Sequence, residues 1–254
     1  RSCGSDSITA RPRKTCRQLP SGDLEPYPNR DAIDNGGALK GQGIEIAWVR
    51  DPVEIAFLMV EGSGSLNLRR SGGSLKFTRV NYDGNNGRTL NMLGRVLLCQ
   101  GAKTEDYSSM SGIKAYLAAH PGARRTTLAF DESYVFFKPG ETGPFGADEI
   151  PVTPRYSFAT DRRILPTGVA MLFHTRRPGG KRDGDCEEIS SLGLAQDSGG
   201  AINGPHVDWY LGEGEEAQRE ADAVNQAGQL YVALPKGGGK LLPECGELAK
   251  PANP

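Results

Sequence analysis

Apolar and polar positions along the first half of the chain follow patterns that predict short elements. Residues 43–49 alternate like a strand, and residues 52–68 combine a continuous apolar run with a Gly-Ser bend, which predicts a buried strand. Residues 73–89 predict a strand followed by a tight loop, because Asn and Gly tolerate positive φ angles. Residues 131–140 predict a further strand.

Helical patterns separate these strands. Apolar spacings of three and four predict a helix over 90–101 that ends at Gly101. Residues 108–121 predict a second helix with a Ser N-cap and a Pro stop. The polar residues 1–43 are rich in Pro, Gly and Arg and predict a loop region with a short helix near 29–39.

Composition shifts at residues 138–154, which are the best candidate for a domain junction. Beyond it, a helix is predicted over 213–227, with Glu in its first turn and Gly after its last. Short strands are predicted at 155–161, 168–175, 192–197, 206–211 and 229–235. Five short strands and one helix in about 90 residues fit a small closed β-barrel. The 34 glycines and 17 prolines likewise favour short strands and turns over long helices.

Charge and apolar content exclude several classes of protein. The net charge of −1 and the pI near 6.4 provide no global field that would recruit a polyanion such as nucleic acid. The longest apolar runs, such as residues 55–60, fall far short of the roughly 20 residues of a membrane-spanning helix, and no signal peptide is visible. Histidines and cysteines lack metal-ligand spacing, so neither a metal nor another cofactor is expected.

The five cysteines leave at least one thiol unpaired because their number is odd. Cys3 with Cys16, or Cys186 with Cys245, are candidates for disulfides in an oxidising compartment, and the sequence does not decide the pairing. Cys99 lies in an apolar stretch and is predicted to be a buried core thiol.

Three aspartates fall at the ends or in the middle of predicted C-terminal strands. Asp197 precedes two glycines and either forms an Asx turn or serves a site that the backbone approaches closely. Asp208 lies in HVDWY and is either an outward-facing strand carboxylate or a partly desolvated general acid. Together with Asp161, at the end of another strand, they predict a convergent carboxylate site.

The three histidines receive different predictions. His206 lies two positions before Asp208, so a regular strand places both side chains on one face. His206 is therefore a candidate to tune the acid. His120 and His174 are predicted to lie on the surface.

Several stretches between residues 40 and 236 resemble the MltA family of lytic transglycosylases, which cleave murein. They occur in the family's order and read GIEIAWVRDPVEIAFLMVEGSGSL, LGRVLL, MSGIKAYLAAHP, SYVFFKP, GPFGADEIPVTP, TDRRILPTG, AQDSGGAI and DWYLGEGEEA. The last blocks resemble the family's 3D domain, named for three aspartates, which here are Asp161, Asp197 and Asp208.

The resemblance implies a mainly β fold with two domains. Residues 20–140 are expected to form a smaller β-rich domain with a few short helices. Residues 141–238 are expected to form a double-psi β-barrel, similar to that of expansins and family 45 endoglucanases. An irregular segment, 1–19, is expected before them and a tail, 239–254, after them. Glycan is expected to bind in the groove between the two domains.

The resemblance also implies a reaction and roles for residues. The expected activity is cleavage of the β-1,4 bond between N-acetylmuramic acid and N-acetylglucosamine in peptidoglycan, which leaves 1,6-anhydro-N-acetylmuramic acid ends. By position, Asp208 matches the single catalytic acid and base, and Asp197 and Asp161 match supporting carboxylates. Substrate contacts are expected at Glu61, Gly62, Ser63, Tyr82, Gly199, Gly200, Ala201 and His206.

Two other functions stay open. One is a non-catalytic, expansin-like glycan-binding protein. The other is a polysaccharide hydrolase of the family 45 endoglucanase type, with Asp208 and Asp161 flanking the scissile bond. The expected partners are peptidoglycan glycan strands, not nucleic acid, and the expected location is the periplasm, in association with the outer membrane. Cys3 lacks the upstream apolar residues of a lipidation site, so any lipid anchor is expected outside this chain.

The chain departs from the family motifs at polar positions expected near the groove. Glu61 replaces Gln, Asn85 and Arg88 replace Lys and His, Ser111 replaces Gln, and Asp131 and Glu132 replace Asn and Pro. Added carboxylates are expected to weaken attraction to the anionic peptide stems of murein. Family members also carry a Gly-Tyr-Tyr-type segment before the small domain. No such segment is found here, so it either precedes this chain or is absent.

Overall fold

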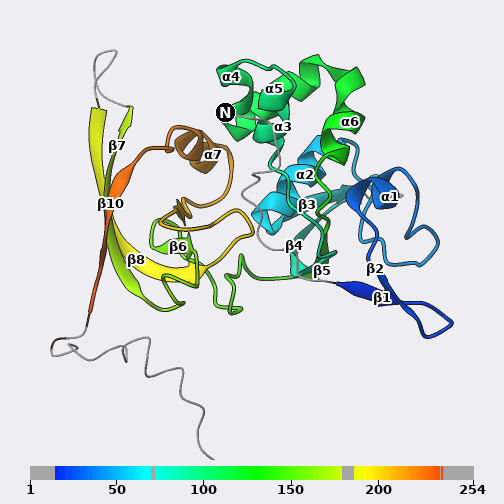
Figure 1. Ribbon diagram of the computed structural model, residues 1–254, viewed down its shortest axis with the longest axis horizontal. Coiled ribbons are helices and arrows are strands. Elements are labelled where there is room, and N and C mark those ends of the chain that lie inside the picture. Colours follow the sequence, from blue (N-terminus) through cyan, green and yellow to red (C-terminus); the bar gives the residue numbers. More distant parts are fainter. Residues whose placement is uncertain (1–14, 70–71, 179–185, 235, 237–254) are drawn as a thin grey trace, which may run out of the picture.

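The structure is a computed structural model that describes residues 15–69, 72–178, 186–234 and 236 (Figure 1). Two lobes stand side by side, one formed by the N-terminal half and one by the C-terminal half. The described strands lie in sheets of two, five and three strands, and the expected mainly β class is confirmed. No helix in the described ranges is long and apolar enough to cross a membrane.

The N-terminal lobe combines antiparallel strands with a group of short helices. Its strands are β1 (Cys16–Gln18) paired with β2 (Leu24–Pro26), and a sheet of β3 (Ser63–Arg69), β4 (Leu75–Asn85) and β5 (Val135–Gly140) in that order. Its helices are α1 (Arg30–Asp34), α2 (Pro52–Glu61), α3 (Leu93–Cys99), α4 (Thr104–Tyr107), α5 (Met110–Ala119) and α6 (Arg124–Ala129). The strands predicted within 73–89 and 131–140, and the three helices predicted near 29–39 and over 90–101 and 108–121, are confirmed.

Two strand predictions in this lobe are wrong. Residues 43–49 form no strand, and residues 52–61 form helix α2 instead of a buried strand. The helix begins after Asp51, whose side chain accepts a hydrogen bond from the Val53 amide, and it ends at Gly62 with a φ of 76°. A continuous apolar run fits a buried helix as well as a buried strand, and here the Asp-Pro start and the Gly stop decide for the helix.

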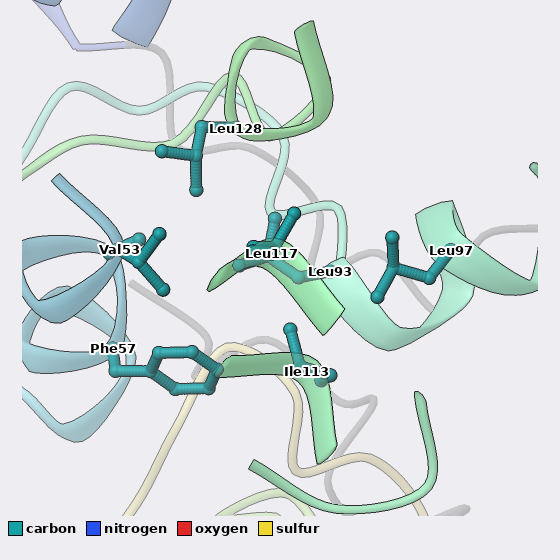
Figure 2. Close-up of a cluster of buried hydrophobic side chains, with 8 residues drawn as sticks. Val53, Phe57, Leu93, Leu97, Ile113, Leu117 and Leu128 are labelled. Carbon is teal, nitrogen blue, oxygen red and sulfur yellow. The ribbon is translucent and has the colours of Figure 1, made fainter. Parts of the chain in front are cut away.

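The core of the N-terminal lobe is a cluster of side chains from four helices, shown in Figure 2. It contains Val53, Ala56, Phe57, Leu93, Leu97, Ile113, Leu117 and Leu128. Leu97 and Leu117 are fully buried. The predicted burial of Cys99 is wrong, because the residue is exposed. Leu93 and Leu97 direct one face of α3 inward, and a residue two positions after Leu97 points away from that face.

The C-terminal lobe is built on one five-stranded sheet in the order β10-β7-β8-β6-β9. Its elements are β6 (Ser157–Thr160), β7 (Ala170–Pro178), β8 (Cys186–Asp197), β9 (Val207–Trp209), α7 (Glu215–Asp222) and β10 (Gly228–Val232). All five predicted strands and the predicted helix are confirmed. Strand β6 runs parallel to β8 and antiparallel to β9. Among the described residues, no pairing joins the end strands β10 and β9.

The disulfides considered from the sequence are only partly visible. Cys16 and Cys186 are exposed, and neither forms a disulfide within the residues that the structure describes. Their candidate partners, Cys3 and Cys245, lie outside the described residues.

A glycine inside β8 lets two strands approach closely. A Cβ atom on Gly193 would lie 2.2 Å from the Tyr156 carbonyl oxygen and 2.6 Å from Cε2 of the buried Phe158. We expect Gly193→Ala to destabilise the protein by about 1–3 kcal/mol, because the backbone must move to relieve the overlap. Urea unfolding measures this, with Gly122→Ala as control, since a Cβ there meets no atom within 4 Å. Equal stability of the two variants would contradict the prediction.

Candidate active site

Strand register in the C-terminal sheet brings two of the predicted aspartates together. β6 lies between β8 and β9, and its residue Ala159 pairs with Asp197 on one side and with Asp208 on the other. Paired residues on neighbouring strands point to the same face of a sheet, and adjacent strands are about 4.8 Å apart. Asp197 and Asp208 therefore share one face across a small alanine, and they interact electrostatically.

Asp208 is the exposed carboxyl group of this pair. It is the middle residue of β9, its side chain is 61% exposed, and Nε2 of His206 lies 2.9 Å from its Oδ1. Desolvation by the surrounding protein raises the pKa of Asp208, and His206 partly opposes this. Solvent reaches the carboxylate, yet enough protein surrounds it to favour the protonated form. Asp208 therefore has two properties of a general acid, namely access and a raised pKa.

Asp197 is less exposed and ends β8. Its Oδ1 accepts a hydrogen bond of 2.8 Å from the backbone amide of Ser198. Burial raises the pKa of Asp197, hydrogen bonds from the amides of Ser198 and Ala147 lower it, and the charge of Asp208 raises it further. Its bond to Ser198 goes to the next residue in the chain, whereas an Asx turn bonds the amide two residues on. Its electrostatic interaction with Asp208 fits the functional alternative.

Asp161 is buried and does not present its carboxylate to solvent. Its side chain accepts hydrogen bonds from the Arg163 backbone amide at 3.1 Å, from Arg163 Nε and Nη2, and from the Gly204 amide at 2.9 Å. The hydrogen bonds from the Arg163 guanidinium, followed by that from Gly204, hold the pKa of Asp161 far below its ordinary value. Asp161 therefore fastens the end of β6 to the loop that leads into β9.

The depressed pKa of Asp161 gives stability a defined pH dependence. A carboxyl group with a lowered folded pKa stabilises the fold above its unfolded value, near 3.8, and loses that effect as pH falls through the folded pKa. We expect Asp161→Asn to melt below the native chain at about pH 7, with a gap that narrows below about pH 4. Thermal unfolding across pH measures it, with the exposed Asp148→Asn as control. A gap independent of pH would contradict this assignment.

The predicted loop contacts Gly199, Gly200 and Ala201 lie in the turn after Asp197. The Ile202 amide donates to the Gly199 carbonyl oxygen at 3.1 Å, and the Asn203 side chain donates to that of Gly200 at 3.3 Å. The buried Ile202 anchors this turn to the lobe. These residues and His206 therefore lie in the loop that joins the two paired aspartates.

Sequence reasoning missed Arg155, which supports the strand of Asp208. Arg155 has a φ of 68°, unusual for a residue with a Cβ. Its amide donates to the Tyr210 carbonyl oxygen at 2.7 Å, and its carbonyl oxygen accepts from Trp209 Nε1 at 3.0 Å. Trp209 also packs edge-on against Phe173, with ring centroids 5.0 Å apart. Because Trp209 faces the core, its neighbour Asp208 faces away from it.

The other predicted substrate contacts lie together on the N-terminal lobe. Glu61 ends α2, Gly62 caps it, and Ser63 begins β3 opposite Asn81 of β4, next to Tyr82. Burial raises the pKa of Glu61, and Tyr82 is 49% exposed. Within the described residues, no hydrogen bond or ion pair joins these four residues to the three aspartates. The predicted site residues thus form two groups, one on each lobe.

Several residues that depart from the family motifs make hydrogen bonds or ion pairs within the protein. Asp131 is 2% exposed and pairs with Arg30 at 2.9 Å, so the expectation that it acts on substrate charge is wrong. Arg88 Nε donates to the Tyr27 carbonyl oxygen at 2.7 Å, and Asn85 Oδ1 accepts from the Gly87 amide at 2.9 Å. Ser111 donates to the side chain of Asp222 in the other lobe.

The two remaining histidines stand apart from the aspartates. His120 is exposed and stacks on Tyr116, with ring centroids 4.1 Å apart. His174 is half-buried, and its Nδ1 lies 2.8 Å from Ser190 Oγ, so its predicted surface position is only partly right. No group of three or more His, Cys, Asp or Glu side chains in the described part of the chain is arranged to hold a metal ion.

Comparison with known proteins gives a consistent result. Residues 5–138 match the MltA specific insert domain, and residues 156–234 match the 3D domain. Membrane-bound lytic murein transglycosylase A of Escherichia coli strain K12 is 34% identical over 209 residues, covering 81% of this chain and 55% of that protein. The enzyme of the same name from Vibrio cholerae is 32% identical over 199 residues, covering 77% and 53%. The chain spans about half the length of these curated relatives.

Solved structures agree with these matches. The crystal structure of a membrane-bound lytic murein transglycosylase from Agrobacterium tumefaciens superposes with a TM-score of 0.77 at 32% identity, covering 89% of this chain and 61% of that one. The structure of E. coli MltA with bound chitohexaose gives a TM-score of 0.68 at 30% identity, covering 85% and 67%. Both family models, the relatives and the shared fold place the chain in one group: it belongs to the MltA family.

Proposed function

We propose that the protein acts as a peptidoglycan lytic transglycosylase. It would cleave the β-1,4 bond between N-acetylmuramic acid and N-acetylglucosamine and leave 1,6-anhydro-N-acetylmuramic acid ends. The observation that carries this proposal is the exposed Asp208, whose pKa is raised and which shares a sheet face with Asp197. The names of the relatives and the glycan in the E. coli MltA structure support the same substrate class.

A single acid suffices for this reaction. Asp208 in its protonated form donates a proton to the glycosidic oxygen as the bond to the leaving sugar breaks. The 6-hydroxyl group of the muramic acid then attacks its own anomeric carbon, and Asp208 accepts the proton of that hydroxyl. The nucleophile belongs to the substrate, so its position in the bound glycan replaces the water and the second carboxylate that hydrolysis requires.

Three neighbouring residues would support the reaction in different ways. His206 lies against Oδ1 and would steady the carboxylate left after the first proton transfer. Asp197 would stabilise positive charge that develops at the anomeric carbon, because its carboxylate faces the same side of the sheet. Asp161 would act at a distance, by holding the end of β6 and the Gly204 loop.

The geometry of Asp161 argues against the hydrolase alternative in the form expected from the sequence. A hydrolase of that form needs Asp161 to activate water or attack the sugar. The carboxylate instead accepts several N–H donors and is buried, and its lowered pKa makes it a weak base. An expansin-like binding protein would not need the raised pKa of Asp208, which also favours the transglycosylase.

We further propose that glycan spans both groups of residues. Glu61, Gly62, Ser63 and Tyr82 would bind sugar units on the N-terminal lobe, and the loop 199–206 would bind units near the cleaved bond. The partner is then the peptidoglycan glycan strand, and the protein works outside the cytoplasm, where murein lies, at the outer membrane in the periplasm.

Product chemistry tests the function. Purified peptidoglycan is digested with the native chain and with Asp208→Asn, and the masses of released muropeptides are measured. Anhydro ends that lack one water relative to reducing ends, formed by the native chain alone, are the expected result. Reducing ends would establish hydrolysis instead. Sedimentation with peptidoglycan but no released product, for both chains, would establish a binding protein.

A further inference from the structure

The two lobes meet along the segment that directly follows Asp208. Arg79 of β4 forms an ion pair with Glu213, and Ser111 of α5 donates to Asp222 of α7. The Gln218 side chain of α7 lies 3.8 Å from the Met110 sulfur of α5. Figure 1 shows α7 on the side of its lobe that faces α4 and α5. We call these contacts the inter-lobe seam.

Among the residues of the inter-lobe seam, Arg79 has the partner nearest to Asp208 in the sequence, because it pairs with Glu213. Its side chain is only 11% exposed, and it reaches across the seam from a strand of the other lobe. Burial raises the pKa of Tyr210, and the positive charge of Arg79 partly opposes this, so the two side chains interact electrostatically. Tyr210 stands two residues after Asp208, and in an extended chain the two side chains share a face.

The backbone between these residues is held from the C-terminal lobe. The Tyr210 amide donates to the Ser157 carbonyl oxygen at 3.0 Å, and the Tyr210 carbonyl oxygen accepts from the Arg155 amide at 2.7 Å. Arg79 therefore holds the segment after β9 a second time, from the opposite lobe, through its ion pair with the Glu213 side chain. β9 has only three residues and is the last strand in its sheet. An ion pair just beyond it can therefore change the orientation of the strand.

Arg79 is buried with part of its hydrogen-bonding capacity unused among the described residues. Its Nε is buried and has no hydrogen-bond partner among the described residues, and the same holds for Oδ1 of Asn81 two positions along β4. Both atoms lie beside Gly143, where an added Cβ would be 3.3 Å from Nε and 2.6 Å from Oδ1. Buried polar groups without partners are rare in proteins, and each exception calls for a reason.

We propose that Arg79 is a positioning residue that fixes Asp208 relative to the N-terminal lobe. The distance between Asp208 and a glycan bound on both lobes would then be fixed, because Arg79 pairs with Glu213 five residues after Asp208. The planar guanidinium offers two parallel N–H donors to a carboxylate such as that of Glu213, which a lysine cannot do. The catalytic effect of Arg79 rests on the proposed transglycosylase function. Its structural effect on β9, through the ion pair with Glu213, does not depend on that function.

Kinetics test the catalytic consequence. We expect Arg79→Gln to lower kcat for peptidoglycan by about 10- to 100-fold with a smaller change in KM, because misplacing a catalytic group by about 1 Å has effects of this size. Arg79→Lys should recover part of the loss. The double variant Arg79→Gln/Glu213→Gln should be no slower than Arg79→Gln, because both changes remove one link. Arg176→Gln, which breaks an exposed Arg–Glu pair with Glu188, is the matched control.

Hydrogen exchange tests the mechanical link without any activity. Amides of residues 207–213 should exchange faster in Arg79→Gln than in the native chain and the Arg176→Gln control. If the native chain releases no anhydro product but this exchange rises, the proposed function fails and the link stands. Unchanged exchange, or an unchanged kcat in an active Arg79→Gln protein, overturns the proposal. A lower melting temperature with native kcat and native exchange would mean a purely structural residue and also overturns it.

Discussion

Asp208→Asn should release anhydro-muropeptides from peptidoglycan about 10²- to 10⁴-fold more slowly than the native chain, the usual contribution of a positioned general acid. Asparagine keeps the size of the side chain and the reach to His206 but carries no transferable proton. The side chain is 61% exposed, so the substitution should leave the fold intact. Initial rates at saturating substrate measure the effect, with binding to peptidoglycan measured by sedimentation in parallel.

The matched control for this variant is Asp23→Asn, which changes an exposed aspartate in the hairpin of β1 and β2. It should retain the native rate. A native rate in Asp208→Asn would rule out this residue as the acid and move attention to Asp197, whose pKa is also raised.

The raised pKa of Asp208 also sets the expected pH profile. The acid must be protonated at the start of the reaction, so the native rate should fall as pH rises through the pKa of Asp208. Desolvation by the surrounding protein raises that pKa above the ordinary 3.8, so the falling limb should lie at a higher pH than for an aspartate surrounded by water alone. The residual rate of Asp208→Asn should lack this limb.

The sequence predicted the elements of the C-terminal lobe well, because each strand carries a local signal. The strand predicted over 206–211 contains β9, and there the structure packs Trp209 against Phe173. The closeness of Asp197 and Asp208 has no local signal. It depends on β6 lying between β8 and β9, with a register irregularity before Ala159 that brings Asp197 opposite it.

Other errors and omissions have the same physical origin. The apolar run in α2 fits either helix or strand, and only its capping residues separate the two. Asp131 follows a helix as a surface residue would, but a partner 101 positions away in the sequence buries it. Arg79 and Arg155 carry ordinary patterns, because their importance comes from contacts with residues after β9.

The buried ion pair of Arg30 and Asp131 should give the largest stability effect. Arg30 Nη2 lies 2.9 Å from Asp131 Oδ2, the two side chains are 3% and 4% exposed, and the pair joins α1 to the segment between α6 and β5. Arg30→Met leaves a buried carboxylate without its cation, and we expect a loss of about 3–5 kcal/mol in the free energy of unfolding at about pH 7. Denaturant titration measures it. Arg17→Met, at a more exposed pair with Glu25, should cost under about 1 kcal/mol.

Two further measurements separate an unpaired charge from lost packing. Burial already raises the pKa of Asp131, and removing Arg30 removes the main opposing charge, so the folded pKa rises further. Below that raised pKa the buried carboxyl group is protonated and uncharged, so the stability deficit of Arg30→Met should shrink as pH falls from neutral through that pKa. Arg30→Met/Asp131→Leu should recover much of the loss, though not all, because the Asn91 and Ser133 amides, each 3.1 Å from Asp131 Oδ1, lose their acceptor. If the loss in free energy of unfolding is constant with pH and unchanged in the double variant, then packing of the Arg30 methylene groups, and not the charge of Arg30, stabilises this contact between α1 and Asp131.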